Sequence, residues 1–340
     1  MKPLPLADLD HVLAYALMKE LRGARLFLTG GTGFFGRWLL ESLCHANARL
    51  GLDVRIVVLS RDPNTFRIAA PHLAGNPALS FVAGDVRDFA FPDGAFSHVL
   101  HAATEASATL NAQAPLQMFD VCAAGTRRAL DFCVESGAKK FLLASSGAVY
   151  GMQPPEISHL PEEYRGAPDP QSPASAYGEG KRVSEFLGAS YARLHDLEVV
   201  SARAWAFVGP GLPLDAHFAI GNFLRDALRG GPLRISGDGT PFRSYLHAAD
   251  LSVWLWTLLL RGQSGRAYNV GSDDAVSIEE TARRVARACS PAPEVVVALK
   301  AKEGVLPPRY VPSIQRARQE LGLEVRIGLD EAIRRTLVWL

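Results

Sequence analysis

Residues 25–36 read Arg-Leu-Phe-Leu-Thr-Gly-Gly-Thr-Gly-Phe-Phe-Gly, and this stretch decides how the chain is expected to fold. Its apolar beginning has the pattern of a short strand, and a helical pattern begins at Arg37. Between them, Gly30, Gly33 and Gly36 are spaced three residues apart. Glycines let the backbone turn tightly and approach a pyrophosphate, whose charge then lies at the N-terminus of the following helix. The stretch predicts a dinucleotide-binding turn, with a strand–helix connection that holds no ligand as the alternative.

Further strand-like runs, rich in Val, Ile, Leu and Phe, alternate with helical patterns along the chain. The strands are expected at 54–60, 79–83, 98–101, 140–145 and 198–203, and the helices at 37–49, 115–135 and 176–195. Apolar strands separated by helix-length segments indicate a parallel sheet that is covered on both faces. With the glycine turn after the first strand, the pattern predicts an α/β fold with a Rossmann-type doubly wound parallel sheet.

The same pattern divides the chain into regions. Residues 1–22 have apolar positions with helical spacing and predict an N-terminal helix. Residues 23–205 form the predicted Rossmann domain, to which segments from about 240–275 are expected to return. Residues 206–340 contain many glycines and prolines between short helices, so we expect a smaller C-terminal substrate-binding region there.

Composition argues against several classes of protein. The 340 residues carry a formal net charge of +1, which gives no general electrostatic reason to expect nucleic acid or a membrane surface as partner. The four cysteines lack metal-ligand spacing and are too sparse for a disulfide framework, so we expect buried thiols in a reducing cytoplasm and no metal site. The longest apolar stretch, near 251–260, is too short to span a bilayer.

The end of the second strand tests which dinucleotide is bound. An NAD site places an Asp or Glu there, which accepts hydrogen bonds from the ribose 2′-hydroxyl. This chain has Ser60 and Arg61 instead, and a hydroxyl with a guanidinium suits a 2′-phosphate. We therefore favour NADP over NAD; the alternative is that Asp62 takes the place of the acid. Asp85 and Val86, after the third strand, have the placement expected of an adenine contact.

Tyr177 and Lys181 are candidates for the reactive centre. They lie four residues apart on a predicted helix and so share one face. A free phenol titrates near pH 10, and lowering its pKa to neutrality takes about 4 kcal/mol, which a close ammonium helps to supply. Ser146, after the fifth strand, offers a hydroxyl to polarise a carbonyl. An exposed helix pair with no catalytic role is the alternative.

The chain resembles an extended short-chain dehydrogenase/reductase of the nucleotide-sugar epimerase/dehydratase superfamily. The resemblance covers nearly the whole chain and is carried by residues 29–36, 84–88, 101–103, 145–151, 177–181, 243–250 and 268–271. It implies Ser146, Tyr177 and Lys181 as catalytic residues and a nucleoside-diphosphate sugar held by the C-terminal region. The implied coenzyme contacts are Gly30, Thr32, Gly33, Phe34, Phe35, Gly36, Ser60, Arg61, Asp85, Val86, His101, Ala102, Ala103, Tyr177 and Lys181.

The resemblance also implies substrate contacts and an assembly. The substrate candidates are Glu105, Ser146, Asn222, Arg243 and Arg309, of which the arginines fall where the family binds the diphosphate. For Glu105, the alternatives are an acid/base group that replaces the family's acidic pair and a solvated loop carboxylate. Ala206 replaces an Asn that relatives usually carry, so the contacts of that Asn are not expected here. The helices at 115–135 and 176–195 correspond to those that pair in the family's dimers, so a homodimer is expected.

Two differences from the family pattern reduce the number of reaction types that this chain is expected to catalyse. The 4,6-dehydratases that the chain resembles carry an Asp-Glu pair where this chain has Gly147 and Ala148, and the decarboxylases carry a Glu at the Ala148 position. Neither side chain can move a proton, which leaves hydride transfer at a hydroxyl or keto carbon. We expect a 4-ketoreductase or an epimerase of bacterial-type cell-surface sugar biosynthesis. The alternatives are a dehydratase-like enzyme with altered acid/base residues and a non-catalytic dinucleotide-binding protein.

Overall fold

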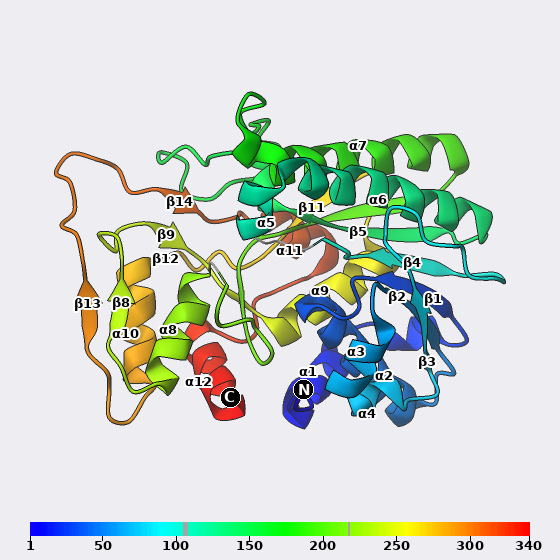
Figure 1. The fold of residues 1–340 in the computed structure, drawn as a ribbon, viewed down its shortest axis with the longest axis horizontal. Coiled ribbons are helices and arrows are strands. Elements are labelled where there is room, and N and C mark those ends of the chain that lie inside the picture. The colour runs from blue at the N-terminus through cyan, green and yellow to red at the C-terminus, as the bar shows by residue number, and fades with distance from the viewer. Residues whose placement is uncertain (105–107, 217) are drawn as a thin grey trace. The chain divides into compact units, whose positions relative to one another are not determined.

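The computed structural model describes residues 1–104, 108–216 and 218–340, and its central feature is a seven-stranded sheet (Figure 1). The strands are β1 (Arg25–Thr29), β2 (Arg55–Ser60), β3 (Leu79–Ala83), β4 (His98–His101), β5 (Lys140–Ser146), β6 (Glu198–Ala204) and β11 (Ala267–Val270). Their order is β11-β6-β5-β4-β1-β2-β3, and the pairings among β1 to β5 are parallel. The predicted doubly wound Rossmann sheet is confirmed, since the order 3-2-1-4-5-6 reverses direction between β1 and β4.

The chain separates into two units. Unit 1 comprises residues 1–151, 167–203 and 252–268, and unit 2 comprises 152–166, 204–251 and 269–340. Sequence reasoning places 152–166 in the Rossmann domain, whereas the structure groups this segment with unit 2. The reason is local pairing, because Gln153 and Leu160 form β-bridges to Arg309 and Pro312. The N-terminal helix is part of unit 1 rather than a separate region.

The helices of unit 1 cover the two faces of the sheet. They are α1 (Leu6–Tyr15), α2 (Phe34–Leu50), α3 (Pro63–Ala69), α4 (Pro71–Ala74), α5 (Ala108–Gln113), α6 (Pro115–Glu135) and α7 (Ala176–His195), with most of α9 (Ala248–Arg261). Figure 1 shows α6 and α7 side by side on one face, while α2 lies on the other. Trp256 of α9 donates a hydrogen bond to Ser42 of α2, 3.1 Å away, which ties these two helices together.

The core under α6 is built from aromatic side chains. Phe27 of β1 lies within 4.4 Å of Phe132 of α6 and 5.3 Å of Phe89, measured between ring centroids. Phe96 and Phe141 belong to the same buried cluster. Aromatic rings bury large apolar areas, so this cluster holds β1, and with it the glycine turn, against α6.

Unit 2 is built from short strands and four helices. The strands form the small sheets β10-β7, β12-β9-β14 and β13-β8. Their bounds are β7 (Phe207–Val208), β8 (Leu233–Ile235), β9 (Phe242–Arg243), β10 (Leu246–His247), β12 (Val276–Ser277), β13 (Val295–Val297) and β14 (Arg309–Tyr310). The helices are α8 (Ala219–Leu228), α10 (Ile278–Arg287), α11 (Gln315–Leu321) and α12 (Leu329–Trp339). The buried Asn269 ties distant segments together, since its amide donates to the carbonyls of Leu160 and Ser313.

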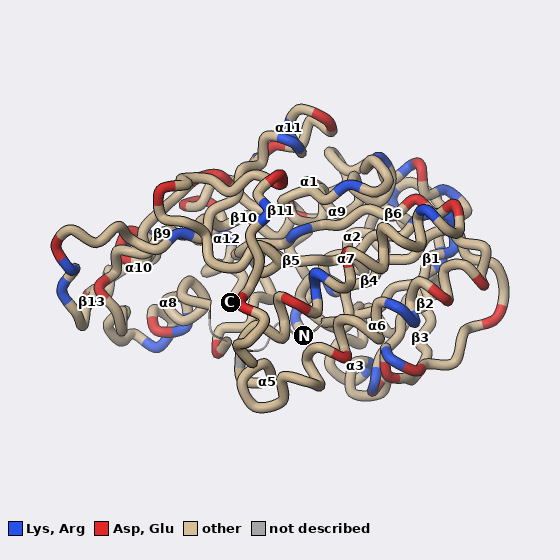
Figure 2. Tube along the Cα trace, turned by 90° about the horizontal axis from the view of Figure 1, so that it is seen from above, with Lys and Arg blue, Asp and Glu red and all other residues tan. Residues whose placement is uncertain are grey.

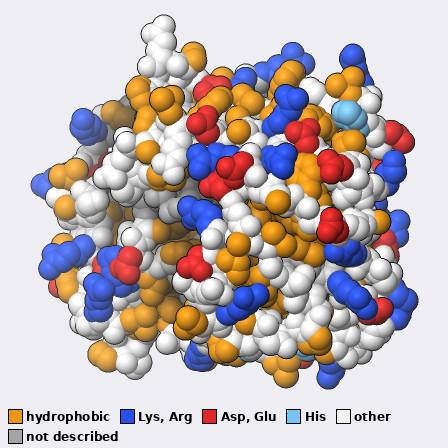
Figure 3. Space-filling view, turned by 45° about the vertical axis from the view of Figure 1, so that its right-hand side comes forward, with side chains coloured by type: hydrophobic (Ala, Val, Ile, Leu, Met, Phe, Trp, Pro, Cys, Tyr) orange, Lys and Arg blue, Asp and Glu red, His pale blue; other side chains and the backbone are white. Residues whose placement is uncertain are grey.

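Surface charges of both signs are interspersed. Figure 2 shows Lys and Arg alternating with Asp and Glu along the chain, and Figure 3 shows both signs scattered over the face in view. In the part of the chain that the structure describes, no helix is both long and apolar enough to cross a bilayer. Within the same residues, no group of His, Cys, Asp or Glu is arranged to hold a metal ion. The four cysteines are present as free thiols.

Candidate functional site

The glycine turn between β1 and α2 is shaped by contacts that only glycine allows. Gly30 has a φ of +74°, and a Cβ there would lie 2.4 Å from the carbonyl oxygen of Ala102. A Cβ on Gly36 would lie 2.3 Å from the carbonyl oxygen of Gly30. Real Cβ atoms do not approach so closely, so both residues are required for the turn to close against β4 and α2.

Gly33 has a different role in the same turn. A Cβ on Gly33 would meet only the Gly30 carbonyl oxygen, at 3.5 Å, and otherwise faces open space. Gly33 is also the N-cap of α2, whose first turn holds neither a side-chain cap nor an acidic residue. The N-terminus of this 17-residue helix, with its dipole, therefore points to a space where a bulky side chain is missing. These residues fit the pyrophosphate of a dinucleotide.

The end of β2 carries the residues that were predicted to choose the coenzyme. Ser60 is the last residue of the strand, and its hydroxyl accepts from the backbone N–H of Asp62 at 3.3 Å. Asp62 is the N-cap of α3: its carboxylate accepts from the N–H groups of Asn64 and Thr65 and from the Thr65 hydroxyl. These hydrogen bonds, above all that of the Thr65 hydroxyl, lower the pKa of Asp62. Asp62 is thus engaged in capping a helix, while Arg61 is exposed beside it.

Asp85 follows β3, at the predicted adenine position. Its carboxylate is held by Arg87, whose Nε and Nη2 atoms lie 2.7 and 3.0 Å from the two oxygens. This pairing lowers the pKa of Asp85. Val86 is buried against α6, where it leaves room only for a glycine at position 125.

The loop after β4 lies against the glycine turn. The N–H of Ala102 donates to the Thr29 carbonyl at 3.1 Å, and the N–H of Ala103 donates to the Thr29 hydroxyl at 3.2 Å. The imidazole of His101 is buried, and both of its nitrogens lie within hydrogen-bond distance of threonine hydroxyls. At this position only backbone atoms remain for a coenzyme, so the predicted contact of His101 does not extend to its side chain.

Lys181 lies four residues after Tyr177 on α7, as predicted. The residue is 2% exposed, and its ammonium donates to the Thr104 hydroxyl at 2.9 Å and to the Ala144 carbonyl at 2.7 Å. The Nζ atom lies 5.9 Å from the centroid of the Tyr177 ring, and burial lowers the pKa of Lys181. Two fixed acceptors therefore hold the ammonium beside the phenol. The third N–H of the ammonium is left to donate to another acceptor.

Ser146 ends β5 close to the beginning of α7. Its hydroxyl accepts from the backbone N–H of Ala148 at 3.1 Å, in the 3₁₀ turn Gly147–Tyr150. A Cβ on Gly178 would lie 2.9 Å from the Ala148 carbonyl oxygen, so α7 touches this turn next to Tyr177. The glycine at 178 permits the close approach that brings the serine turn and the tyrosine helix together.

A half-buried ion pair supports the end of β5. Ser145 donates to Glu185 at 2.6 Å, and Glu185 forms a double ion pair with Arg203, whose shortest distance is 2.7 Å. The guanidinium also donates to the Tyr150 hydroxyl at 2.8 Å. Burial alone would lower the pKa of Arg203, but Glu185 outweighs it and raises the value. This network connects β5, β6, α7 and the turn after Ser146.

Two residues that support the site were not singled out from the sequence. Thr104 holds the ammonium of Lys181, and Asn111 of α5 accepts from the backbone N–H of Tyr177 at 3.0 Å. Asn111 also donates to the Ala174 carbonyl at 2.7 Å, so it caps α7, which has no cap of its own. A signal for Thr104 existed, since it directly follows the motif at 101–103. Asn111 has no such signal.

The predicted substrate residues of unit 2 fall into two groups. Arg243 and Arg309 lie on the neighbouring strands β9 and β14, where Arg309 is paired with Phe242 and covers its ring at 4.4 Å. Asn222 lies within α8, and its side-chain oxygen accepts from Arg225 at 3.0 Å. Glu105 lies outside the described residues. The pairing of β9 with β14 brings the two arginines into one small sheet.

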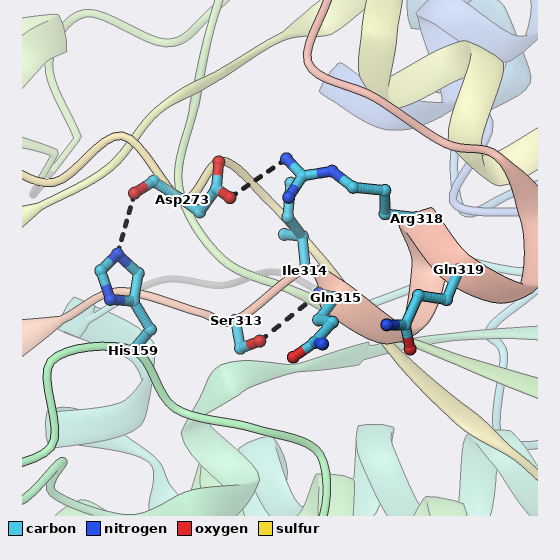
Figure 4. A pocket seen from close by; sticks show the side chains of 7 residues that line it. All are labelled: His159, Asp273, Ser313, Ile314, Gln315, Arg318 and Gln319. Carbon is cyan, nitrogen blue, oxygen red and sulfur yellow. Dashed lines mark hydrogen bonds and ion pairs between the residues drawn. The ribbon is translucent and has the colours of Figure 1, made fainter.

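A separate cavity of about 360 Å³ lies within unit 2 (Figure 4). It is lined by His159, Asp273, Ser313, Ile314, Gln315, Arg318 and Gln319. His159 donates to the Asp273 carbonyl at 2.9 Å, and Arg318 pairs with the Asp273 carboxylate at 3.2 Å. Its lining, as described, includes none of the predicted substrate residues.

Comparison with known proteins identifies a family. The sequence model of the NAD dependent epimerase/dehydratase family matches residues 26–271. UDP-glucuronic acid decarboxylase 6 of Arabidopsis thaliana is 29% identical over 312 residues, which cover 91% of this chain and 86% of that protein.

Solved structures have the same fold. The Bordetella bronchiseptica enzyme WbmF in complex with NADH is similar with a TM-score of 0.77 and 22% identity, over 94% of this chain and 93% of that one. UDP-glucose 4-epimerase of Thermotoga maritima with UDP-glucose has a TM-score of 0.76 and 21% identity, over 93% of this chain and 98% of that one.

Proposed function

The chain belongs to the NAD dependent epimerase/dehydratase family, and we propose that it transfers hydride at a hydroxyl or keto carbon of a nucleoside-diphosphate sugar. The net reaction is that of a 4-ketoreductase or an epimerase. The names of a relative and of a structural neighbour, which refer to UDP-glucuronic acid and UDP-glucose, support this substrate class. The observation that carries the proposal is the ammonium of Lys181, buried beside Tyr177 on two fixed acceptors.

Tyr177, Ser146 and Lys181 have separate roles in the proposed hydride and proton transfer. A bound nicotinamide supplies or accepts the hydride. In the direction of reduction, the Tyr177 hydroxyl donates a proton to the sugar oxygen while the Ser146 hydroxyl hydrogen-bonds to that oxygen. The positive charge of Lys181 stabilises the resulting phenolate, and the remaining N–H of Lys181 is available to the coenzyme ribose. One proton and one hydride together convert the ketone to an alcohol, and the reverse steps oxidise it.

The turn after Ser146 argues against elimination and decarboxylation. By resemblance, those reactions use acidic side chains at the positions of Gly147 and Ala148. Here the first has no side chain and the second has a methyl group, so neither can donate or accept a proton. An enzyme with altered acid/base residues would need another proton donor, and none is identified among the described site residues. This difference separates the proposal from the activity for which the decarboxylase relatives are named.

Replacement of Tyr177 by Phe tests the proposal. Loss of the proton donor should lower turnover by about 1000-fold, with coenzyme binding retained, because general acid catalysis contributes on this order. The assay combines the protein with NADPH or NADH and a panel of nucleotide sugars and 4-keto nucleotide sugars, and follows both coenzyme oxidation and product. Tyr15→Phe, at an exposed position in α1, is the matched control and should behave as wild type. Full turnover by the Tyr177→Phe protein would refute the assignment, and absence of turnover by wild type with every substrate would favour a non-catalytic binding protein.

The preferred coenzyme is part of the proposal. Support for NADP comes from Asp62, whose carboxylate already caps α3, which leaves Ser60 and Arg61 to meet a 2′-group. Replacing Arg61 by Ala should weaken NADPH binding by about 10- to 100-fold, the value of one charge-assisted contact, and leave NADH binding nearly unchanged. Asp62→Asn is the matched variant. If that variant instead loses NADH binding while Arg61→Ala changes nothing, the enzyme uses NAD.

A homodimer through α6 and α7 remains a further proposal from the family resemblance. Phe186 on α7 and Leu116 on α6 are exposed apolar side chains in the single chain, at 68% and 79%. Phe186→Glu should convert a dimer to a monomer in sedimentation equilibrium, since burying the carboxylate is costly. A wild-type protein that sediments as a monomer would contradict this part of the proposal.

A further inference from the structure

Four buried polar side chains form a hydrogen-bonded chain across unit 1. Thr29 of β1, His101 of β4, Thr126 of α6 and Ser184 of α7 are each no more than 1% exposed. The Thr29 hydroxyl lies 2.9 Å from His101 Nδ1, and His101 Nε2 lies 3.1 Å from the Thr126 hydroxyl. The Thr126 and Ser184 hydroxyl oxygens are 2.9 Å apart. These contacts link the strand before the glycine turn to the helix that carries Lys181.

The carbonyls at the Ser184 end determine the direction of the hydrogen bonds as far as His101 Nε2. At one end the Ser184 hydroxyl faces the carbonyls of Cys122 and Gly180, at 2.9 and 3.0 Å, and carbonyls only accept. Ser184 must therefore donate to them and accept from Thr126. Since Thr126 has a single proton, it accepts from His101 Nε2, which must carry hydrogen.

At the other end the N–H of Ala103 donates to the Thr29 hydroxyl, so this oxygen already accepts one bond. The Thr29 hydroxyl can donate to His101 Nδ1 when this nitrogen carries no hydrogen, which is its state in a neutral ring protonated on Nε2. A neutral imidazole with hydrogen on Nε2 alone satisfies both sides. Burial, with a contribution from Lys181, lowers the pKa of His101 to about 3, in agreement with this state.

We propose that the chain Thr29–His101–Thr126–Ser184 positions Lys181, with His101 acting as a neutral Nε2–H link between the coenzyme loop and α7. Each end of this hydrogen-bonded chain has a partner one residue away in sequence from Lys181 or from an acceptor of its ammonium. Ala103 precedes Thr104, whose hydroxyl accepts from Lys181 Nζ, and the Gly180 carbonyl belongs to the residue before Lys181. The four hydrogen-bonded side chains thus connect the loop that contains Thr104, an acceptor of the ammonium, with the backbone of α7 just before Lys181. This proposal rests on the function proposed above for Lys181 and Tyr177.

Loss of the hydrogen bonds of Thr126 should make the positions of the coenzyme loop and of α7 less fixed. Valine at position 126 has nearly the shape of threonine but can neither accept from His101 nor donate to Ser184. The ammonium then loses its fixed distance from the phenol and stabilises the phenolate less. The consequence is an effect on chemistry, which loss of stability alone would not produce.

Thr126→Val is the primary test, with Thr126→Ser as the conservative variant and Thr257→Val as the control. Thr257 is buried in α9 and donates to the Val253 carbonyl, so its replacement reports the general cost of losing a buried hydroxyl. We expect Thr126→Val to lower kcat about 10-fold or more, with a smaller change in substrate KM, and to shift the pKa that limits kcat upward. Thr126→Ser should restore both. The inference is overturned if Thr126→Val keeps the wild-type kcat and pH profile, or if Thr257→Val changes them equally.

A second measurement does not depend on turnover. Nitrogen-15 NMR of histidine-labelled wild-type protein, with His101 assigned by the His101→Gln variant, reports which ring nitrogen carries hydrogen. Hydrogen on Nε2 alone supports the chain, and hydrogen on Nδ1 or a doubly protonated ring at neutral pH refutes it. Full turnover by Tyr177→Phe would instead overturn the proposed function and leave the NMR result intact. The two failures are therefore distinguishable.

Discussion

Replacing His101 by Gln should make the folded protein less sensitive to acid. The imidazole has an ordinary pKa of 6.5 when unfolded and about 3 in the folded chain, because it is fully buried and close to Lys181. Between these values the unfolded state binds a proton that the native state does not. Stability from this group is therefore complete above pH 6.5 and is lost progressively as the pH falls toward 3.

The size of the effect follows from the same shift. Each pH unit below 6.5 costs about 1.4 kcal/mol, so wild type should lose about 2 kcal/mol between pH 7 and pH 5 through His101 alone. Glutamine does not titrate, so the His101→Gln protein should lack this loss, although its stability at pH 7 is lower. His98, whose pKa burial lowers to about 4, contributes equally to both proteins and cancels in the difference.

Urea unfolding at several pH values measures the difference. Fluorescence and circular dichroism should be followed together, since coincident transitions are needed to treat a chain of two units as two-state. His195→Gln, at an exposed position near the end of α7, is the matched control for the loss of a histidine. Equal pH dependence in wild type and His101→Gln would refute the burial of a neutral imidazole.

Three further substitutions test the turn and the half-buried ion pair. Gly33→Ala should leave the melting temperature nearly unchanged but weaken NADPH binding, since the added methyl has only the Gly30 carbonyl oxygen near it. Calorimetry measures both quantities, and unchanged binding would contradict the pyrophosphate site. Gly36→Ala should cost about 3 kcal/mol in urea unfolding, because its Cβ would lie 2.3 Å from the Gly30 carbonyl, and equal stability would refute the turn geometry. Arg203→Met should cost about 3 kcal/mol because Glu185 loses its cation and keeps the Ser145 hydrogen bond, and a second change of Glu185 to Leu should recover most of this loss.

Much of the Rossmann unit was predictable because its signals are local. The runs at 25–29, 79–83 and 98–101 coincide with β1, β3 and β4, and the predicted helices at 115–135 and 176–195 have the bounds of α6 and α7. Strand and helix periodicities depend on neighbours along the chain, so they can be read without knowing the fold. The same holds for Tyr177 and Lys181, whose common face follows from their spacing on one helix.

The site around these residues depends on contacts between distant segments. Thr104 reaches Lys181 across 77 residues, and Asn111 reaches the backbone of Tyr177 across 66. Asp62 is an acid near the end of β2 in the sequence, but the structure uses its carboxylate to cap α3. No periodicity reports such partners, since each depends on how strands and helices pack.

The class of fold, the glycine turn and the helix that carries the tyrosine and lysine can be read from the sequence, because sterics and hydrophobic periodicity act over a few residues. The packing of distant segments sets the supporting partners and the membership of 152–166 in unit 2. It also decided the state of His101, which depends on three hydroxyls from three other elements. A hydrogen bond needs both partners within about 3 Å, and only the packed chain brings these groups that close.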